Sequence, residues 1–296
     1  MQAHSARQMM TDFETVSLHR ISKLPLDGDA KIFRQYPAFK LGVAAGVRYY
    51  AQLLLPLVKR LISESEHTGW ILTSPAIDAQ TPAAANLLCR ELFELYARGR
   101  DSGTSQELSL IEIQYDNEPA ASAERNDADK SQDYAALDFA DRVTERERLA
   151  RQLVRNPDLH GRPVLFVNDI CVTGAQQHTM QHYFERAEAA CVRWLYVIVV
   201  DPEIGRMKPE IEWEINFAPF EDLLQMASRE EIQFTGKCVQ RLMRLRVAEL
   251  EQVLQALDQQ RRTRLLELTV LNGFPNLGDF QEQVGLVRLY GTEQTI

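Results

Sequence analysis

The chain has 296 residues, of which 45% are hydrophobic and 25% are charged, and its formal net charge is -9. This length can bury a sizeable core in one large or two small domains, and the composition is that of an ordinary soluble globular protein. The acidic balance argues against a general nucleic-acid binder, because that function needs clustered positive charge.

The cysteines and the apolar runs indicate a cytoplasmic protein. The spacing of the four cysteines matches neither a disulfide framework nor a zinc knuckle, so we expect reduced thiols. These cysteines are Cys89, Cys171, Cys191 and Cys238. Residues 1–20 lack the apolar core of a signal peptide, and no apolar run approaches the length of a membrane span.

The first regular element that the sequence predicts is a helix. Residues 1–30 show no clear hydrophobic period and are interpreted as an arm or a loosely packed lead-in. Residues 32–42 are rich in aromatic and basic side chains, which suit either plain packing or the edge of a lid. From residue 43 to 62, apolar residues recur at helical spacing, and Pro56 predicts a kink or break within this helix.

A strand, a loop and a helix are predicted next. Residues 70–73 form a short apolar run and are taken as the first core strand. A loop at 74–81 then leads into a helix over residues 82–99, with Thr81 as its cap and a proline at its first position. Residues 108–115 alternate well enough to predict a second strand.

Charged and small polar residues dominate positions 116–133, and this composition predicts a mobile loop. A helix rich in both charges is predicted over residues 134–154. After the next strand, a helix over 175–190 and a buried strand over 192–200 are expected. This alternation of strands and helices predicts a parallel sheet covered on both faces, with ligands at the carboxyl ends of the strands.

The most informative pattern is a buried strand that runs into a phosphate loop. Residues 164–167 are a continuous apolar run, and Asn168 and Asp169 stand where this strand should end. Thr173 and Gly174 then form a tight turn into a helix. Such a turn leaves backbone N–H groups without intrahelical partners, and with the helix dipole these groups favour phosphate. The polar pair could reach ribose hydroxyls while the loop holds the phosphate.

The carboxyl-terminal third is predicted to be mostly helical. Residues 211–217 alternate between apolar and polar side chains and are interpreted as a half-exposed strand in a cap over the site. Helices follow from about residue 221, and the Asn-Gly-x-Pro sequence at 272–275 is a strong stop signal. The arginines near residue 244 are interpreted as a solvated face or a contact for a partner.

A histidine pair offers a weaker hypothesis. His178 and His182 share one helical face, a spacing that suits a zinc pair. The sequence places no third ligand beside them, so a solvated or packed face is the favoured interpretation.

Residues 164–176 resemble, in register, the phosphoribosyl pyrophosphate (PRPP) motif of the type I phosphoribosyltransferases. In that motif a hydrophobic strand ends in two acidic residues and is followed by a Thr-Gly phosphate loop. Two positions depart from it, because the first acidic position is Asn168 and the hydroxyl residue often found near the loop end is Gln176.

The resemblance covers roughly residues 39–201 and is weaker outside the motif. Residues 36–40 are similar to an aromatic-Lys stretch that precedes the first helix in some of these enzymes. Residues 74–85 resemble the pyrophosphate loop of orotate-type enzymes without its usual lysine, and an ordinary turn between strand and helix is the alternative. The long acidic loop and extra helices look most like the ComF-like branch, including members that accompany tellurium-resistance gene clusters.

The family assigns roles to these positions. The resemblance implies that the 5-phosphate is held by Thr173, Gly174, Ala175, Gln176 and Gln177. Asn168 and Asp169 would bind the ribose hydroxyls as the catalytic pair, with Asp169 as the base or cation stabiliser and an indirect contact of the metal. Pyrophosphate and Mg²⁺ would face Ser74, Ala76, Asp78, Gln80 and Thr81.

In this family the connection after the second strand forms a flexible loop that closes over the active site. The resemblance implies that residues 116–133 close in the same way and exclude water from the site. A cation for pyrophosphate could come from Arg125, Lys130, Arg142 or Arg146. For each of these residues alone, a solvated helix charge is the favoured alternative.

The resemblance implies an α/β fold of the type I phosphoribosyltransferase kind, with a Rossmann-like parallel sheet, flanking helices, a small hood and an extra carboxyl-terminal helical region. We expect residues 1–38 to form an arm and part of the hood, residues 39–205 the core, and residues 206–296 a hood strand and the helical extension. A homodimer is possible.

The implied activity is Mg²⁺-dependent transfer of the phosphoribosyl group from PRPP to a small-molecule nitrogen acceptor, with release of pyrophosphate. The acceptor cannot be identified from the sequence. A non-catalytic PRPP-binding regulatory protein is the alternative, and Asn168 and the missing loop lysine favour it. A scaffold whose extra helices bind a partner is the third possibility.

Overall fold

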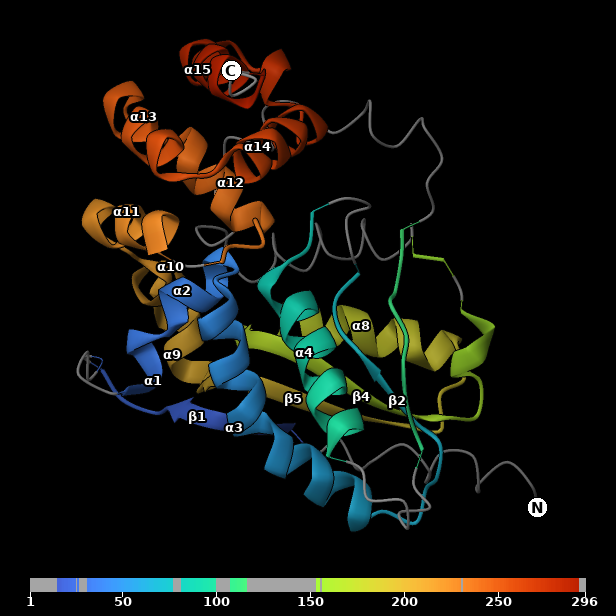
Figure 1. Ribbon diagram of the computed structural model, residues 1–296. Helices are drawn as coiled ribbons and strands as arrows, with labels where there is room; N and C mark the ends of the chain where they lie inside the picture. Colours follow the sequence, from blue (N-terminus) through green and yellow to red (C-terminus); the bar gives the residue numbers. More distant parts are fainter. Residues whose placement is uncertain are drawn as a thin grey trace.

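A five-stranded parallel sheet forms the centre of the protein (Figure 1). The computed structural model describes residues 15–24, 26, 31–76, 81–99, 107–115, 153–154, 156–229 and 231–292. The strands are β1 (Thr15–Ile21), β2 (Trp70–Thr73), β3 (Leu108–Leu110), β4 (Pro163–Cys171) and β5 (Cys191–Val200), in the sheet order β1-β5-β4-β2-β3. The predicted α/β fold with a parallel sheet is confirmed.

Strand β4 lies in the middle of the sheet and extends further than its apolar run suggests. It pairs with β5 as far as Cys171, so Asn168 and Asp169 lie inside the strand and not after its end. Both residues are buried, with 3% and 9% exposure. Neighbouring residues in a strand point to opposite faces of the sheet, so these two side chains leave β4 on different sides.

The amino-terminal segment departs from the prediction of a loosely packed lead-in. Residues 15–21 form β1, which pairs in parallel with β5 at the edge of the sheet. Val16 and Leu18 pack against the core, while most of the strand is only half-buried. An edge strand needs only a few apolar side chains on one face, and this explains why its sequence shows no clear period.

Helices cover both faces of the sheet (Figure 1). One face packs against α3 (Ala44–Ser63) and α4 (Ala84–Arg98), and the other packs against α8 (Ala175–Arg186). Helix α3 continues through Pro56 as one element, so the predicted break does not occur. The short helices α1 (Lys31–Arg34), α2 (Tyr36–Leu41) and α9 (Pro202–Met207) lie beside the carboxyl ends of the strands.

Helix α4 begins at Ala84, two residues later than predicted, and Thr81 is not its cap. The side chain of Asn86 accepts a hydrogen bond from the backbone N–H of Ala83 at 2.7 Å. Its amide nitrogen also donates to Ser74 Oγ at 3.0 Å and to the carbonyl oxygen of Pro75 at 2.7 Å. Asn86 therefore fixes the start of α4 against the loop that follows β2.

The predicted hood strand at residues 211–217 is wrong, because this segment forms helix α10 (Ile211–Asn216). Ile211 and Ile215 lie one turn apart and are both buried, whereas Trp213 and Phe217 are 51% and 47% exposed. A helix with two buried residues at this spacing produces the same short alternation of apolar and polar residues as a strand.

The carboxyl-terminal third is mostly helical, as predicted, and the helices after α10 share an apolar core of their own. They are α11 (Phe220–Arg229), α12 (Gly236–Met243), α13 (Val247–Ala256), α14 (Gln259–Leu271) and α15 (Gln281–Thr292). Helix α14 ends at the predicted stop, where Gly273 has a φ of 74°. Short 3₁₀ turns lie at Pro157–Leu159, Phe274–Asn276 and Gly278–Phe280.

Several hydrogen bonds attach this helical region to the sheet domain, among them the backbone pairs Ala44 N–H to Glu231 O and Gln233 N–H to Gly42 O, both at 2.9 Å. Thr235 Oγ1 donates to the carbonyl oxygen of Lys40 at 2.7 Å, and the N–H of Gly236 donates to the carbonyl oxygen of Pro82 at 3.2 Å. The side chain of Asn272 donates to Thr81 Oγ1 at 3.0 Å. The helical region is therefore fixed against α2 and the end of the loop that follows β2.

Several predictions fall largely outside the described residues. Residues 116–133, for which a mobile loop was predicted, lie there together with the cations proposed for the pyrophosphate, and so do Asp78 and Gln80. Of the helix predicted at 134–154, only the end is described, and there Leu153 forms an antiparallel bridge with Tyr115. The strand predicted at 108–115 is confined to β3. Among the helices of the described ranges, none has both the length and the apolar character needed to cross a bilayer.

Gly205 should tolerate no side chain. A Cβ atom at this position in α9 would lie 2.1 Å from the carbonyl oxygen of Val172, in the loop that follows β4. We expect Gly205→Ala to lower the free energy of unfolding by about 1–3 kcal/mol, because α9 must move away from this loop. Chemical denaturation measures the change.

Gly285→Ala provides the matched control. Gly285 is exposed within α15, and a Cβ there meets no described atom within 4 Å. This change should raise stability by up to about 1 kcal/mol, through helix propensity alone. If Gly205→Ala is as stable as the parent, the close packing of α9 on the loop is wrong.

Candidate functional site

The turn into α8 has the geometry expected of a phosphate loop. Gly174 is the N-cap of this helix and has a φ of 79°, a conformation that favours glycine. Gly174 has no side chain to cap the helix, and Thr173 Oγ1 accepts a hydrogen bond from the N–H of Ala175 at 3.4 Å. A Cβ on Gly174 would meet no atom within 4 Å. The space in front of this helix start is therefore open, and an approaching anion could accept from backbone N–H groups of its first turn.

The side chains of the first turn are used to position it. Asn168 Nδ2 donates to Gln176 Oε1 at 2.8 Å. Gln177 Oε1 accepts from the hydroxyl of Tyr196 on β5, and its Nε2 donates to Thr15 Oγ1 on β1, both at 3.3 Å. These contacts join α8 to three strands, so Gln176 and Gln177 can serve phosphate through their backbone while their side chains hold the loop.

Asp169 lies on the opposite face of β4 and forms a buried ion pair. Its Oδ2 accepts a hydrogen bond from Lys40 Nζ, while its Oδ1 accepts from the N–H of Ile170 at 2.8 Å. Lys40 Nζ also lies 3.4 Å from Glu212 Oε1. We call Lys40, Asp169 and Glu212 the charge cluster. It joins α2, β4 and α10 at the carboxyl end of the sheet.

The charge cluster keeps Lys40 protonated. Burial alone would lower the pKa of Lys40, but the negative charges of Asp169 and Glu212 outweigh this effect and raise its pKa to about 12. The side chains of the three residues are only 9%, 12% and 13% exposed. One cation thus faces two carboxylates in a site that is nearly closed to water.

Tyr36 lies next to the charge cluster and is completely buried. Burial raises its pKa well above the ordinary value, and the charges of Asp169 and Glu212 raise it further, so the phenol stays neutral. Within the described ranges its hydroxyl has no hydrogen-bond partner. Because buried polar groups are normally paired, this hydroxyl is an unsatisfied donor beside the charge cluster.

The predicted pyrophosphate loop begins at the same edge of the sheet. Ser74 directly follows β2, which pairs with β4, and its hydroxyl accepts from Asn86. Ala76 packs against the core beside α8, and Thr81 accepts from Asn272. The structure thus brings the described ends of this loop to the edge that carries Asp169, and their polar groups already have protein partners.

Two residues of the charge cluster were not predicted as site residues. Lys40 was noted within an aromatic and basic stretch that resembles a segment of the family, without a role in the site. Glu212 was assigned to the polar side of a strand that is in fact α10. The sequence could have indicated the position of Glu212 only if residues 211–216 had been interpreted as a helix. The rings of His178 and His182 lie 4.5 Å apart, but among the described residues no group of three metal-binding side chains includes them.

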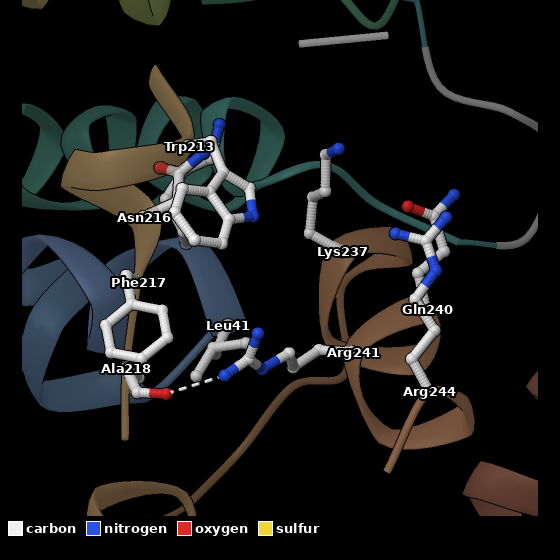
Figure 2. Close-up of a pocket in the computed structure, with 10 residues that line it drawn as sticks. Leu41, Trp213, Asn216, Phe217, Ala218, Lys237, Gln240, Arg241 and Arg244 are labelled. Carbon is white, nitrogen blue, oxygen red and sulfur yellow. Dashed lines mark hydrogen bonds between the residues drawn. The ribbon is translucent and has the colours of Figure 1, made fainter. Parts of the chain in front are cut away.

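A pocket opens beside the charge cluster, between α10 and α12 (Figure 2). Lys40 and Leu41 of α2 contribute to its wall, together with the face of α12 that carries Lys237 and Arg241. The remaining wall consists of Trp213, Asn216, Phe217 and Ala218. Figure 2 shows Arg241 extending across the pocket to the carbonyl oxygen of Ala218, to which it donates at 2.8 Å. Lys40 therefore belongs both to the charge cluster and to this pocket.

Lys40→Met should destabilise the fold strongly. The change leaves Asp169 and Glu212 buried without their cation, and breaking a buried pair in this way costs about 3–5 kcal/mol. Chemical denaturation at neutral pH should show this loss. Lys59→Met on the exposed face of α3 serves as control and should change stability by less than about 0.5 kcal/mol.

The pH dependence gives a second check on the same variant. The folded-state pKa of Lys40 lies above its ordinary value of 10.5, so its stabilisation is complete below that pH and is lost as the pH rises through about 12. The difference between parent and variant should be constant near neutrality and should narrow in this alkaline range. An unchanged difference would contradict the assignment.

Comparison with known proteins identifies the family. The model of a family described as PRTase ComF-like, where PRTase stands for phosphoribosyltransferase, matches residues 106–287. No match was found among curated proteins. The matched range includes β4, the turn into α8 and most of the helical region. It overlaps the predicted resemblance at residues 106–201, continues beyond it to residue 287 and does not include residues 39–105. The match covers more than half of the sequence, and the chain therefore belongs to the ComF-like phosphoribosyltransferase family.

Proposed function

We propose that the protein is a Mg²⁺-dependent phosphoribosyltransferase that transfers the phosphoribosyl group of PRPP to a small-molecule nitrogen acceptor. The observation that carries this proposal is the open turn at Gly174, where the start of a 12-residue helix offers its N–H groups and dipole to a phosphate. Family membership supports phosphoribosyl transfer in general terms.

The reaction places three demands on the protein. The bond from C1 of the ribose to pyrophosphate breaks and its electron pair leaves with pyrophosphate, while a nitrogen lone pair forms the new bond to C1. Positive charge grows on the ribose in the transition state. The protein must hold the 5-phosphate, orient the ribose and stabilise this charge. In our proposal the loop at 173–177 meets the first demand and Asp169 meets the third.

In this proposal the magnesium ion is bound mainly by the substrate. The described residues contain no group of three or more side chains able to form a protein metal site. Mg²⁺ commonly binds through one or two carboxylates together with substrate phosphates. Asp169 is the carboxylate that the sheet edge offers for an indirect contact, and a bound Mg²⁺ would neutralise the charge of the pyrophosphate.

Lys40 has a double role in this proposal. When it pairs with Asp169, the carboxylate is neutralised and can do little for a ribosyl cation. Pyrophosphate carries several negative charges and would compete for the same ammonium group. Movement of Lys40 toward pyrophosphate would release Asp169 and would supply the cation that the loop after β2 lacks among its described residues.

The ion pair also favours a second candidate function, a regulatory protein that binds PRPP without turning it over. If Lys40 stays on Asp169, and Asn168 stays on Gln176, neither residue of the expected catalytic pair is available for chemistry. The phosphate loop would still bind its ligand. The two candidate functions therefore share the phosphate loop. They differ in whether Asp169 becomes available to stabilise the ribosyl cation.

Gly174→Val should weaken PRPP binding by at least tenfold. A branched side chain at this turn would block the N–H groups and would strain a backbone with positive φ. Calorimetry with PRPP and Mg²⁺ measures the loss.

Gly161→Val is the matched control. Gly161 also has a positive φ of 68°, and a Cβ there meets no described atom within 4 Å, but it lies before β4 at the other end of the strand. The Gly161→Val variant should carry the same backbone strain as Gly174→Val but should bind PRPP with the affinity of the parent. Equal PRPP affinity in both variants would exclude the turn as the phosphate site.

Asp169→Asn should separate catalysis from binding. The change removes the negative charge with almost no change in shape, and one lost transition-state contact of this kind reduces rate by about 10²–10³. We expect pyrophosphate release with a panel of nitrogen acceptors to fall by more than PRPP affinity does.

Asn168→Asp provides the opposite change, since it restores the acidic pair of the family motif, and should raise PRPP affinity or turnover. Normal turnover in Asp169→Asn would place the chemistry elsewhere. If the parent and Asn168→Asp both bind PRPP and neither releases pyrophosphate with any acceptor, the regulatory protein replaces the enzyme.

A further inference from the structure

The pocket between α10 and α12 combines cations with exposed aromatic rings. Lys237, Arg241 and Arg244 are spaced i, i+4 and i+7, so they share one face of the helix and its end. Among the described residues that line the pocket, none is acidic, although the whole chain carries a net charge of -9. A concentration of positive charge in an acidic protein favours an anionic ligand.

The opposite wall favours a planar ligand. Trp213 and Phe217 are about half exposed, and their ring centroids lie 5.7 Å apart. The guanidinium group of Arg241 lies 5.3 Å from the ring centre of Phe217, in a cation–π contact. Large aromatic side chains that stay exposed beside a cavity commonly mark a ligand site. Stacking on such rings selects flat molecules.

The size and position of the pocket further limit the class of ligand that it can bind. Its cavity volume is about 90 Å³, well below the roughly 300 Å³ at which typical ligand pockets begin. A pocket of this size favours a small ligand, part of which would extend into the opening, over a nucleoside. Lys40 forms part of the wall and its Nζ contacts Asp169, so the pocket adjoins the expected position of the ribose.

We propose that this pocket binds the acceptor, and that the acceptor is a single-ring nitrogen heterocycle bearing a carboxylate. The proposal rests on the phosphoribosyl transfer proposed above. The carboxylate pairs with the cations of α12, and the ring stacks at Trp213. The ring nitrogen then bonds to C1 as the bond from C1 to pyrophosphate breaks. Pyrophosphate leaves with the electron pair and takes up any proton released from that nitrogen.

Trp213 provides a local signal for the test. The other two tryptophans, Trp70 and Trp194, are completely buried, so a change in tryptophan fluorescence on ligand binding reports mainly on the pocket. The parent is titrated with pyridine and pyrimidine carboxylates, each paired with its carboxamide. We expect saturable quenching by at least one carboxylate, with affinity at least tenfold higher than that of its neutral partner.

Two variants test whether the carboxylate of the ligand binds to the cations of α12. Lys237→Gln should weaken carboxylate binding by about tenfold and leave carboxamide binding unchanged, because only the charged contact is lost. Lys59→Gln makes the same charge change on the exposed face of α3 and should have no effect. Equal binding of carboxylates and carboxamides, no binding of either, or equal effects of the two variants would overturn the proposal.

PRPP calorimetry on the same samples separates this proposal from the proposed function. If PRPP binds while the ring carboxylates fail these criteria, the pocket assignment is wrong and phosphoribosyl transfer still stands. If carboxylates bind with the expected dependence on Lys237 and PRPP does not bind, the ligand class holds and the acceptor role is overturned together with the transferase.

Discussion

The buried contact of Lys40 with Asp169 and Glu212 is the interaction on which the rest of the site depends. Two carboxylates cannot remain charged in a nearly closed site without a cation, because their desolvation would cost several kcal/mol each. Lys40 supplies that cation from α2, and in doing so it fixes α2 and α10 over the carboxyl end of β4. The same contact joins the expected ribose position to the pocket beside α12.

The carboxyl-terminal helices complete the site as well as extend the fold. Thr235 holds the backbone of Lys40, and Gly236 and Asn272 hold the end of the loop after β2. Displacement of the helical region would therefore disturb both the charge cluster and the predicted pyrophosphate loop. The family match continues to residue 287, so most of these helices belong to the part of the chain that the family shares.

The sequence predicted the parts of the structure that depend on local pattern. The β4 strand, the Thr-Gly turn and α8 were predicted because a buried strand, a glycine with positive φ and a helix each leave a signal within a few residues. The role of β1 was missed because an edge strand needs little apolar sequence, and α10 was mistaken for a strand. The pairing of Lys40 with Asp169 spans 129 residues, and no local pattern carries such a contact.

The most direct test of the account is ³¹P NMR of PRPP with Mg²⁺ and a stoichiometric amount of protein, before and after a heterocyclic carboxylate is added. The account predicts that the 5-phosphate resonance shifts on binding, because backbone N–H groups at the start of α8 contact it. It also predicts that free pyrophosphate appears only after the acceptor is added. A 5-phosphate resonance that stays unchanged at excess protein would contradict the phosphate loop, and with it the proposed function.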